Sequence, residues 1–463
     1  MTARVVVVGA GVSGLATAYR LSRADDPPDV LVLESDGSPG GKVRSAVVGG
    51  LELEAGPDSL IARKPWAADL CRELGLGDEL IAPAPVPTHI YTDKGLLRFP
   101  TGPFGISTDP VELARWPGLS YAGKVRAGGD LVLPRRREEG DESLGSLLRR
   151  RIGDEATETL VAPLLGGLFA GDIDRLSVLA TFPEIAAWER EHGSITRGAR
   201  AQTKTATAHR APGPGRQPMF LRLRGGLHRL TDALTSALGQ ERVRLGTPVT
   251  SVIRDGDAYL VRTDDEEIPA DAFVLATPAF VTEQLVSDLA PQAVPELAGI
   301  PYVSTAVVLL VYPEGTGQRL PESSGFVSPR GRLAITAATL VSRKWPDPSF
   351  GTRAVVRCFI GAWGMEESLA LPDDELIERV DDQLAEIFDL STRPDAAEVV
   401  RWPGAMPQYE VGHLDRVDRI EAAMPPGIFV VGQAFRGAGI PDCVRQANET
   451  ADRVLAALSS VRT

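Results

Sequence analysis

The chain has 463 residues, 43% of them hydrophobic, 24% charged and 6% aromatic, which is the composition of a folded protein of about two or three domains. The 49 basic and 62 acidic residues give a net charge of −13, so the chain lacks the overall positive charge of a nucleic-acid-binding protein. The cysteines, Cys71, Cys358 and Cys443, are too far apart for a zinc or redox motif or a disulfide framework, as expected in the reducing cytoplasm.

The first predicted elements are a strand at 5–8, a helix at 15–22 and a second strand at 30–34. Two apolar strands joined by a crossover helix predict a parallel sheet that is covered on both faces. The run Val5 to Val8 is too short for the core of a signal peptide, so we expect a cytoplasmic protein.

A glycine motif joins the first strand to the helix, because residues 9–14 read Gly-Ala-Gly-Val-Ser-Gly and match G-x-G-x-x-G. In this motif Gly9 permits a tight turn, Gly11 lets the backbone approach a pyrophosphate, and Gly14 lets helix and strand pack closely. Glu34 follows Gly14 by twenty residues, at the end of the second strand, where it can accept hydrogen bonds from ribose hydroxyls. The segment therefore predicts a dinucleotide site that favours FAD or NAD over NADP.

The middle of the chain is predicted to be mostly helical. We expect helices at 65–81 and at 143–168, the second ending near the pair Gly166-Gly167. Residues 193–218 are rich in Gly, Thr, Arg, Ala and Pro without periodicity, so we expect a mobile loop there, either a lid or a disordered segment.

The second half is predicted to contain two groups of strands and two helices. Strands are expected at 243–245, 249–254, 258–263, 272–276, 305–312, 333–340, 354–360 and 427–431, and helices at 373–388 and 441–458. The longest apolar stretches, 160–170 and 305–312, are far shorter than the roughly 18 residues that cross a bilayer, so no transmembrane segment is expected and peripheral membrane contact stays open.

Two further segments carry a family resemblance. The sequence Glu34-Ser35-x(4)-Gly-Gly-Lys42-x-Arg44 resembles the FAD superfamily that includes amine oxidases, carotenoid desaturases and protoporphyrinogen oxidases. Residues 432–444, Gly-Gln-Ala-Phe-Arg-Gly-Ala-Gly-Ile-Pro-Asp-Cys-Val, resemble the C-terminal signature of protoporphyrinogen and coproporphyrinogen III oxidases. The blocks 57–60, 163–172, 342–346, 401–403 and 406–409 extend this resemblance over nearly the whole chain.

The resemblance implies an α/β fold with a Rossmann-like FAD-binding domain, a mixed-sheet substrate domain and a helical domain. We expect the FAD-binding domain to be discontinuous, at 1–90, 226–290 and 400–463. The mostly helical domain, with the 193–218 loop, would occupy 91–225, and the substrate-binding domain 291–399.

Residue matching to the family assigns FAD contacts to the glycine loops and to four later segments. These residues are Gly9, Ala10, Gly11, Val12, Ser13, Gly14, Glu34, Ser35, Lys42, Gly56, Pro57, Asp58, Ser59, Val249, Trp402, Ala438, Gly439 and Ile440. For Val249 a plain buried strand residue stays an alternative, and for Trp402 a core aromatic. Backbone N–H groups of 438–440, at the start of the last helix, would face the pyrimidine side of the flavin.

The family resemblance also implies a substrate, a porphyrinogen with carboxylate arms that loses six electrons to oxygen in three two-electron cycles and yields hydrogen peroxide. A backbone carbonyl matching Gly167 would orient the pyrrole N–H groups, with a helix C-cap as the alternative. Arg63 and Lys64 would bind the carboxylates unless they are merely solvated, and Arg343 and Lys344 are further candidates. The five histidines show no zinc-binding spacing, so no metal is expected.

Three functions stay open at this point. The first is oxidation of coproporphyrinogen III, as in the Gram-positive enzymes that supply a ferrochelatase, and its variant is oxidation of protoporphyrinogen IX. The second is another flavin-dependent amine oxidase or desaturase, which would share the first 60 residues but lack the block 436–443. The third is a binding module of the prenyl-GTPase escort type, which would not use flavin for redox chemistry. The oligomeric state is not predicted.

Overall fold

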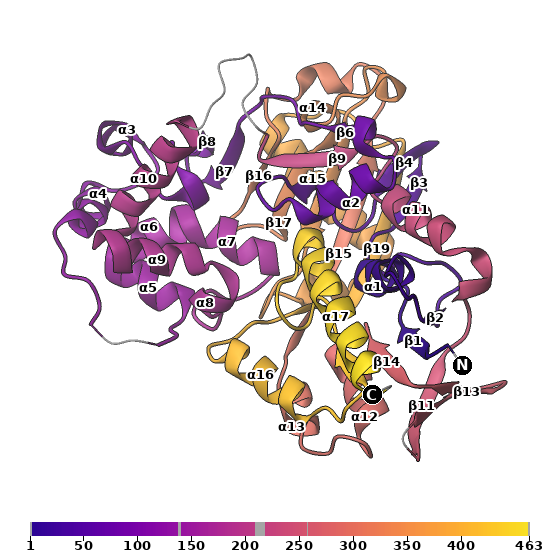
Figure 1. Cartoon of the computed structure of the whole chain (residues 1–463). Helices are drawn as coiled ribbons and strands as arrows, with labels where there is room; N and C mark the ends of the chain where they lie inside the picture. Colours follow the sequence, from indigo (N-terminus) through magenta and orange to yellow (C-terminus); the bar gives the residue numbers. More distant parts are fainter. Residues whose placement is uncertain (1, 138–139, 209–217, 257, 462–463) are drawn as a thin grey trace.

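A parallel sheet, a larger mixed sheet and a separate group of helices make up the computed structural model, which describes residues 2–137, 140–208, 218–256 and 258–461 (Figure 1). The N-terminal strand–helix–strand unit forms as predicted, from β1 (Arg4–Val8), α1 (Val12–Ser22) and β2 (Asp29–Leu33). β1 and β2 pair in parallel, with Val5 opposite Val30. The predicted α/β class, with its mixed sheet and its helices, is confirmed.

The parallel sheet draws its strands from three distant parts of the chain. β10 (Val243–Arg244), β14 (Ala272–Leu275) and β20 (Ile428–Val430) join the first two strands in the order β10-β2-β1-β14-β20. Successive side chains of β1 alternate between two cores: Val5 and Val7 pack in one cluster, Val6 and Val8 in another. This double burial explains why the strand is an unbroken run of valines.

The mixed sheet has seven strands in the order β19-β15-β18-β17-β16-β7-β8. These strands are β7 (Thr88–Thr92), β8 (Gly95–Arg98), β15 (Tyr302–Val311), β16 (Gly325–Val327), β17 (Ile335–Leu340), β18 (Val355–Ile360) and β19 (Ala396–Pro407). α15 (Asp373–Phe388) packs its apolar side on the face that carries Val308 and Val356. The domain boundaries stay a prediction, and the sheet includes β7 and β8 from outside the range 291–399.

The helical group lies on the opposite side of the molecule from α1 and β1 (Figure 1). Its main helices are α3 (Pro110–Arg115), α4 (Tyr121–Gly128), α5 (Leu144–Ile152), α7 (Ala162–Phe169), α9 (Pro183–His192) and α10 (Ile195–Ala208). The stretch predicted as helical at 143–168 is confirmed, but it is interrupted at Gly153, whose φ is +82°. A shared core of buried Leu, Ile and Trp side chains holds these helices together.

Two sequence predictions are wrong in part. The predicted loop at 193–218 contains the helix α10, on which Ile195 and Ala199 are buried against α9. A side chain at Gly198 would collide with Trp188, so this helix packs closely through small residues of the kind that are also common in loops. Residues 209–217 of the same predicted loop lie outside the described chain.

The helix predicted at 65–81 is shorter than expected. α2 (Trp66–Glu73) is followed by Gly75, whose positive φ of +79° ends the helical path. The remaining residues form a short turn of helix at Gly77–Glu79 and the strand β6 (Leu80–Ile81).

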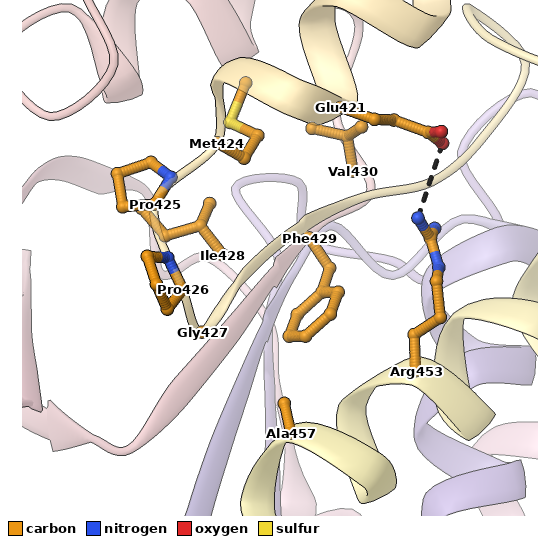
Figure 2. Close-up of a pocket in the computed structure, with 10 residues that line it drawn as sticks. All are labelled: Glu421, Met424, Pro425, Pro426, Gly427, Ile428, Phe429, Val430, Arg453 and Ala457. Carbon is orange, nitrogen blue, oxygen red and sulfur yellow. Dashed lines mark ion pairs between the residues drawn. The ribbon is translucent and has the colours of Figure 1, made fainter. Parts of the chain in front are cut away.

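A surface cavity of about 260 Å³ lies beside the edge strand β20, between the turn 424–427 and α17 (Ile440–Val461) (Figure 2). Glu421 and Arg453 form an ion pair of 3.5 Å across it. The turn precedes β20, so the cavity borders the amino end of that strand. Ligands of parallel sheets bind at the carboxyl ends of the strands, and the loops at that end are therefore the candidate site.

Candidate functional site

The first glycine loop, between β1 and α1, has the shape that a phosphate site needs. Gly9 has a φ of +103°, and a side chain at Gly14 would collide with the carbonyl oxygen of Gly9, so both positions require glycine. At Gly11 an added Cβ would meet nothing within 4 Å, and no side chain caps the start of α1. The loop therefore offers backbone N–H groups at a helix N-terminus, where an anion binds well.

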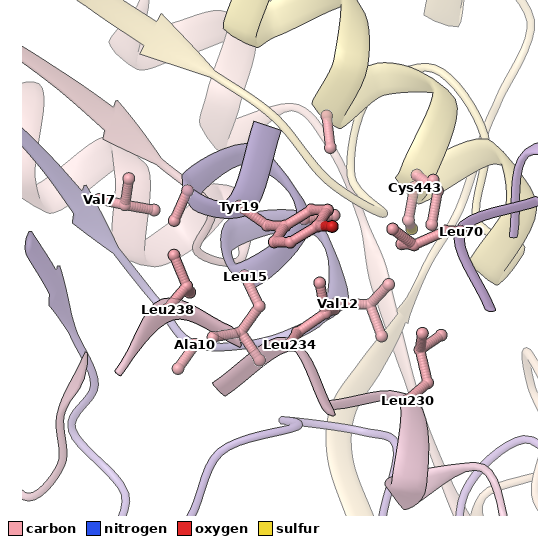
Figure 3. Packing of buried hydrophobic residues seen from close by; sticks show 14 of the residues in the cluster. Val7, Ala10, Val12, Leu15, Tyr19, Leu70, Leu230, Leu234, Leu238 and Cys443 are labelled. Atoms are coloured by element: carbon pink, nitrogen blue, oxygen red, sulfur yellow. The ribbon is translucent and has the colours of Figure 1, made fainter. Parts of the chain in front are cut away.

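This loop is held by the core beneath it. Figure 3 shows Val12 and Leu15 packed among Leu230, Leu234 and Leu238 of α11 (His228–Leu238). This packing anchors the start of α1, and with it the N-terminal N–H groups, on the core.

Glu34 lies beside the first loop, as predicted. Its Oε2 accepts a hydrogen bond of 2.6 Å from the backbone N of Ala10, and its Oε1 accepts one of 2.9 Å from the N of Asp36. Ser35 donates to the same Oε1 at 3.2 Å. The strand β11 (Val249–Asp255) begins next to this segment, since Thr247 N donates to Glu34 O at 2.7 Å. Val249 is thus near Glu34, although its contact with adenine stays a prediction.

The second glycine loop packs on the first. Gly40 N donates to Ala10 O at 2.8 Å, and a Cβ at Gly41 would lie 3.5 Å from the Cα of Gly11. Lys42 extends from this loop toward the C-terminal segment, where its Nζ donates to Gln433 Oε1 at 2.6 Å. Burial lowers the pKa of Lys42 to about 8.

The third loop, residues 55–59, follows β4 (Leu51–Glu54) and touches the second. A side chain at Gly56 would collide with Lys42 O, so glycine is required at this crossing. Trp402 Nε1 donates to Ala55 O at 2.9 Å, which places this predicted cofactor residue against the loop. Asp58 accepts from Ser59 Oγ at 2.8 Å and pairs with Lys344 at 2.9 Å, so Lys344 binds this loop and is not a free carboxylate anchor.

The C-terminal glycine segment is fixed by an aromatic pair that the sequence did not single out. Tyr409 is fully buried, and its hydroxyl donates to Gln433 O at 2.5 Å and accepts from Gly437 N at 3.1 Å. His413 stacks on the Tyr409 ring at 4.0 Å, and its Nε2 lies 2.8 Å from Phe435 O. Burial lowers the pKa of His413 to about 4. Residues Ala438, Gly439 and Ile440 follow, at the start of α17.

The predicted substrate residues lie at the edge of this arrangement. Gly167 is exposed in the last turn of α7, and its carbonyl accepts a 3.2 Å hydrogen bond from Ala170 N, as a helix-terminal residue would. Arg63 forms an ion pair of 2.7 Å with Glu184. Lys64 pairs with Asp442 at 2.6 Å, which ties the segment after the third loop to α17.

Two further findings concern the described residues. No group of three or more His, Cys, Asp or Glu side chains in them is arranged to hold a metal ion. None of the helices built from those residues combines the length and apolar character needed to cross a membrane.

Three glycine loops meet here at the carboxyl edge of a parallel sheet, and the C-terminal segment contacts them through Lys42. This arrangement suits a ligand made of two nucleotides, and it is the site of a dinucleotide-binding flavoprotein. Residues 12–455 match the model of the flavin containing amine oxidoreductases, so the chain belongs to that family. FAD is its cofactor. The open backbone at Gly11, the uncapped start of α1 and the buried Lys42 fit the pyrophosphate of this group.

Known proteins resemble the chain over its full length. It is 33% identical to the Bacillus subtilis (strain 168) protein named coproporphyrinogen III oxidase, over 98% of each chain. It is 29% identical to the chloroplastic protoporphyrinogen oxidase of Oryza sativa subsp. japonica, over 98% of this chain and 88% of that protein. A crystal structure from Exiguobacterium sp. 255-15, provisionally named protoporphyrinogen oxidase, matches with a TM-score of 0.86 and 33% identity over 98% and 99% of the two chains.

If Lys42 contacts FAD as predicted, binding of FAD to the apoprotein should weaken above about pH 8, because the neutral amine no longer attracts the negative charge of the cofactor. The dissociation constant should rise by up to about tenfold per pH unit above that value. The pKa of Lys42 in the folded chain, about 8, lies below its usual 10.5. Between these two pH values the unfolded chain binds more protons than the folded chain, so the free energy of unfolding of the apoprotein increases as the pH rises. Fluorescence titration of apoprotein with FAD, from pH 7 upward, measures the dependence. Lys42→Met should flatten it, and equal slopes in both proteins would contradict the assignment.

Proposed function

We propose that this protein is an oxygen-dependent FAD enzyme that oxidises coproporphyrinogen III to coproporphyrin III in haem biosynthesis. The observation that carries the proposal concerns residues 432–442, the segment with the porphyrinogen-oxidase signature: Lys42 of the second loop binds Gln433, and Lys64, just after the third loop, pairs with Asp442. The name of the Bacillus subtilis relative supports the substrate. When bound, FAD accepts two electrons at a time, so the six-electron oxidation takes three cycles.

The described residues divide this work between the two ends of the cofactor. The loop 9–14 would bind the pyrophosphate with its N–H groups, and Glu34 would bind the ribose hydroxyls. Lys42 would add a positive charge. Residues 438–440 would direct the N-terminal N–H groups of α17 at the flavin ring, where they stabilise negative charge. These residues bind and orient, and the proposal needs no side-chain acid or base among them.

The substrate would lie between the flavin and the helical group. α7 contacts the residues that hold the C-terminal segment: the Phe169 ring centroid is 5.6 Å from that of Tyr409, and the Phe169 carbonyl accepts from Gln408 Nε2 at 2.9 Å. The exposed Gly167 lies two residues before Phe169, and we propose that its carbonyl orients the pyrrole N–H groups. Arg63 and Lys64 would bind carboxylate arms with the exposed parts of their side chains, since 48% and 31% of these side chains stay exposed beside their partners.

Aerobic incubation of the purified protein with coproporphyrinogen III tests the proposal. Porphyrin fluorescence should grow together with peroxide, at about three peroxides for each porphyrin, since six electrons leave in pairs. Protoporphyrinogen IX and a set of primary amines are run in parallel. Faster turnover of protoporphyrinogen IX would favour the alternative that the rice relative's name suggests, and amine oxidation alone would reject the porphyrinogen substrate.

Lys64→Ala is expected to raise KM for coproporphyrinogen III about tenfold with little change in kcat, because a carboxylate anchor outside the reacting centre contributes mainly to binding. Asp442→Asn is the matched control, since it breaks the same ion pair but leaves the lysine in place. A KM increase of equal size in both variants would show that Lys64 acts only by holding α17.

The proposal has three parts that concern the cell: a cytoplasmic location, peripheral contact with the membrane, and transfer of the product to a ferrochelatase. Five exposed apolar side chains of the helical group support the second part, on α3, on α4 and in the segment after α4: Val111, Tyr121, Val125, Val132 and Leu133. Co-sedimentation with vesicles of anionic lipid tests membrane contact. Product transfer is tested by adding ferrochelatase and comparing haem precursor formation with and without a trap for free coproporphyrin.

A further inference from the structure

A cluster of buried and partly buried charges lies between the third loop and the mixed sheet. Its members are Glu54, Asp58, Arg222, Lys344 and Arg357, which come from four separate segments of the chain. Three cations face two carboxylates, so the cluster carries one more positive than negative charge when all are ionised. Taking such charges out of water is costly unless each has a partner.

Arg357 is the most deeply buried member, with 1% of its surface exposed. It extends from β18, in the middle of the mixed sheet, and its Nη2 donates a hydrogen bond to the carbonyl oxygen of Gly56. Its Nη1 lies 3.9 Å from Asp58 Oδ2, and its guanidinium carbon lies 4.6 Å from the centre of the Phe359 ring. One side chain of the sheet thus contacts both ends of the turn Gly56–Asp58.

The guanidinium is not fully satisfied by the described residues. Its Nε and Nη1 make no hydrogen bond with them, and neither do Arg222 Nε and Glu54 Oε2 nearby. A cavity of about 10 Å³ adjoins these atoms, room for about one water molecule. Burial lowers the pKa of Arg357, and the neighbouring Asp58 and Glu54 oppose this shift. A plain packing role does not explain a buried cation with unpaired donors, because an apolar side chain would fill the space at lower cost.

Asp58 shows that the cluster fixes the loop. Burial alone would raise the pKa of its carboxyl, but Lys344 and Arg357 hold that pKa well below its usual value. Trp345 Nε1 adds a third contact at 3.3 Å. The loop is therefore fastened on the side that faces the mixed sheet, while its other side faces the crossing with Lys42.

We propose that Arg357 is a positioning residue of the flavin site. It holds the turn Gly56–Asp58 on the side that faces the mixed sheet, so that a shift of the sheet would also move the turn. The inference rests on the proposed function, since it takes this turn to be a flavin contact. If the flavin ring binds at this turn, the excess positive charge of the cluster would also favour electrons on it. Two effects follow from the loss of Arg357: weaker FAD binding and a more negative flavin midpoint potential.

The test compares Arg357→Met, Arg357→Lys and the control Arg353→Met in the full-length protein. Arg353 lies just before β18 and contacts Ser349 O and Phe350 O, away from the turn. FAD affinity, the visible flavin spectrum and the midpoint potential are measured for each. Arg357→Met should raise the FAD dissociation constant about tenfold or more and lower the potential, Arg357→Lys should recover part of both, and Arg353→Met should match the wild type.

A second readout tests the link to the sheet. Added coproporphyrin III, the proposed product, should perturb the flavin spectrum of the wild type, and this change should disappear in Arg357→Met while the porphyrin still binds. If Arg357→Met does not fold, Arg357→Lys is used instead. Lysine is shorter and cannot form the two-pronged contact of a guanidinium, so this variant should still raise the FAD dissociation constant severalfold. Wild-type affinity, spectrum and potential in a folded Arg357 variant would overturn the inference. A wild-type protein that binds no FAD would instead reject the proposed function.

Discussion

Gly11→Ala is expected to raise the dissociation constant of FAD about a hundredfold, about 2.7 kcal/mol, while the apoprotein stays folded. The structure separates these two effects. An added Cβ at Gly11 meets no protein atom within 4 Å, so the fold has room for it, but the space it enters is where the pyrophosphate would approach the backbone. At Gly14 the same change collides with Gly9 O, so that variant is expected to lose the fold as well.

The measurement is FAD titration of apoprotein, together with circular dichroism and the thermal midpoint of the apo form. Gly37→Ala is the matched control, because it is an exposed glycine of the segment after β2, with no atom within 4 Å of its added Cβ. It should bind FAD like the wild type. If Gly11→Ala binds FAD as tightly as Gly37→Ala, the first loop is not the pyrophosphate site.

The second large effect is on stability. Arg151→Met is expected to destabilise the helical group by about 3–5 kcal/mol, because it leaves the carboxylate of Asp130 buried without its charge partner. Both side chains are fully buried and pair at 2.5 Å. The guanidinium also donates to the carbonyl oxygens of Asp130 and Gly193, at 2.6 and 2.8 Å. One arginine of α5 therefore joins the turn after α4 to the start of α10.

Thermal denaturation and limited proteolysis of the helical segments measure this loss. Arg149→Met, on the same helix, is the control: its side chain is 27% exposed and pairs with Asp174 and Glu158 at the surface, where an ion pair contributes about 1 kcal/mol or less. The Arg151 variant should unfold at a clearly lower temperature than the Arg149 variant. Equal thermal midpoints in the two variants would show that the buried ion pair contributes no more to stability than the surface pairs.

Patterns within a short stretch were enough to predict the nucleotide half of the site. The strand–helix–strand unit, its glycine loop and the position of Glu34 are all contained in about 30 residues, so their spacing reflects their geometry directly. The strands of the parallel sheet, three strands of the mixed sheet (β15, β17 and β18) and the helix Asp373–Phe388 were predicted from periodicity for the same reason, whereas β7, β8, β16 and β19 of the mixed sheet were missed. The helix α10 was missed, because its composition, rich in Gly, Thr, Arg and Ala, is typical of a loop, and glycine lets it pack closely on α9.

Contacts between distant segments could not be predicted in this way. Tyr409 stood in a block that resembles the family, but nothing in that block shows that its hydroxyl binds the backbone of Gln433 and Gly437. Lys64 was expected to be an anchor for substrate, and only the structure shows its ion pair with Asp442. Arg357 was one residue of a predicted strand, without any sign of its bond to Gly56.

The sequence by itself therefore determined the class of fold and predicted a dinucleotide-binding glycine loop, because local spacing and backbone freedom depend on neighbouring residues, and the choice of FAD followed from the family resemblance. Only the tertiary structure decided which charges are paired and which side chains pack against the third loop, residues 55–59. Arg357 and Gly56 are separated by 301 positions in the chain, and their meeting depends on how the mixed sheet packs against the nucleotide-binding part. Such packing is a property of the whole fold, which no short stretch of sequence contains.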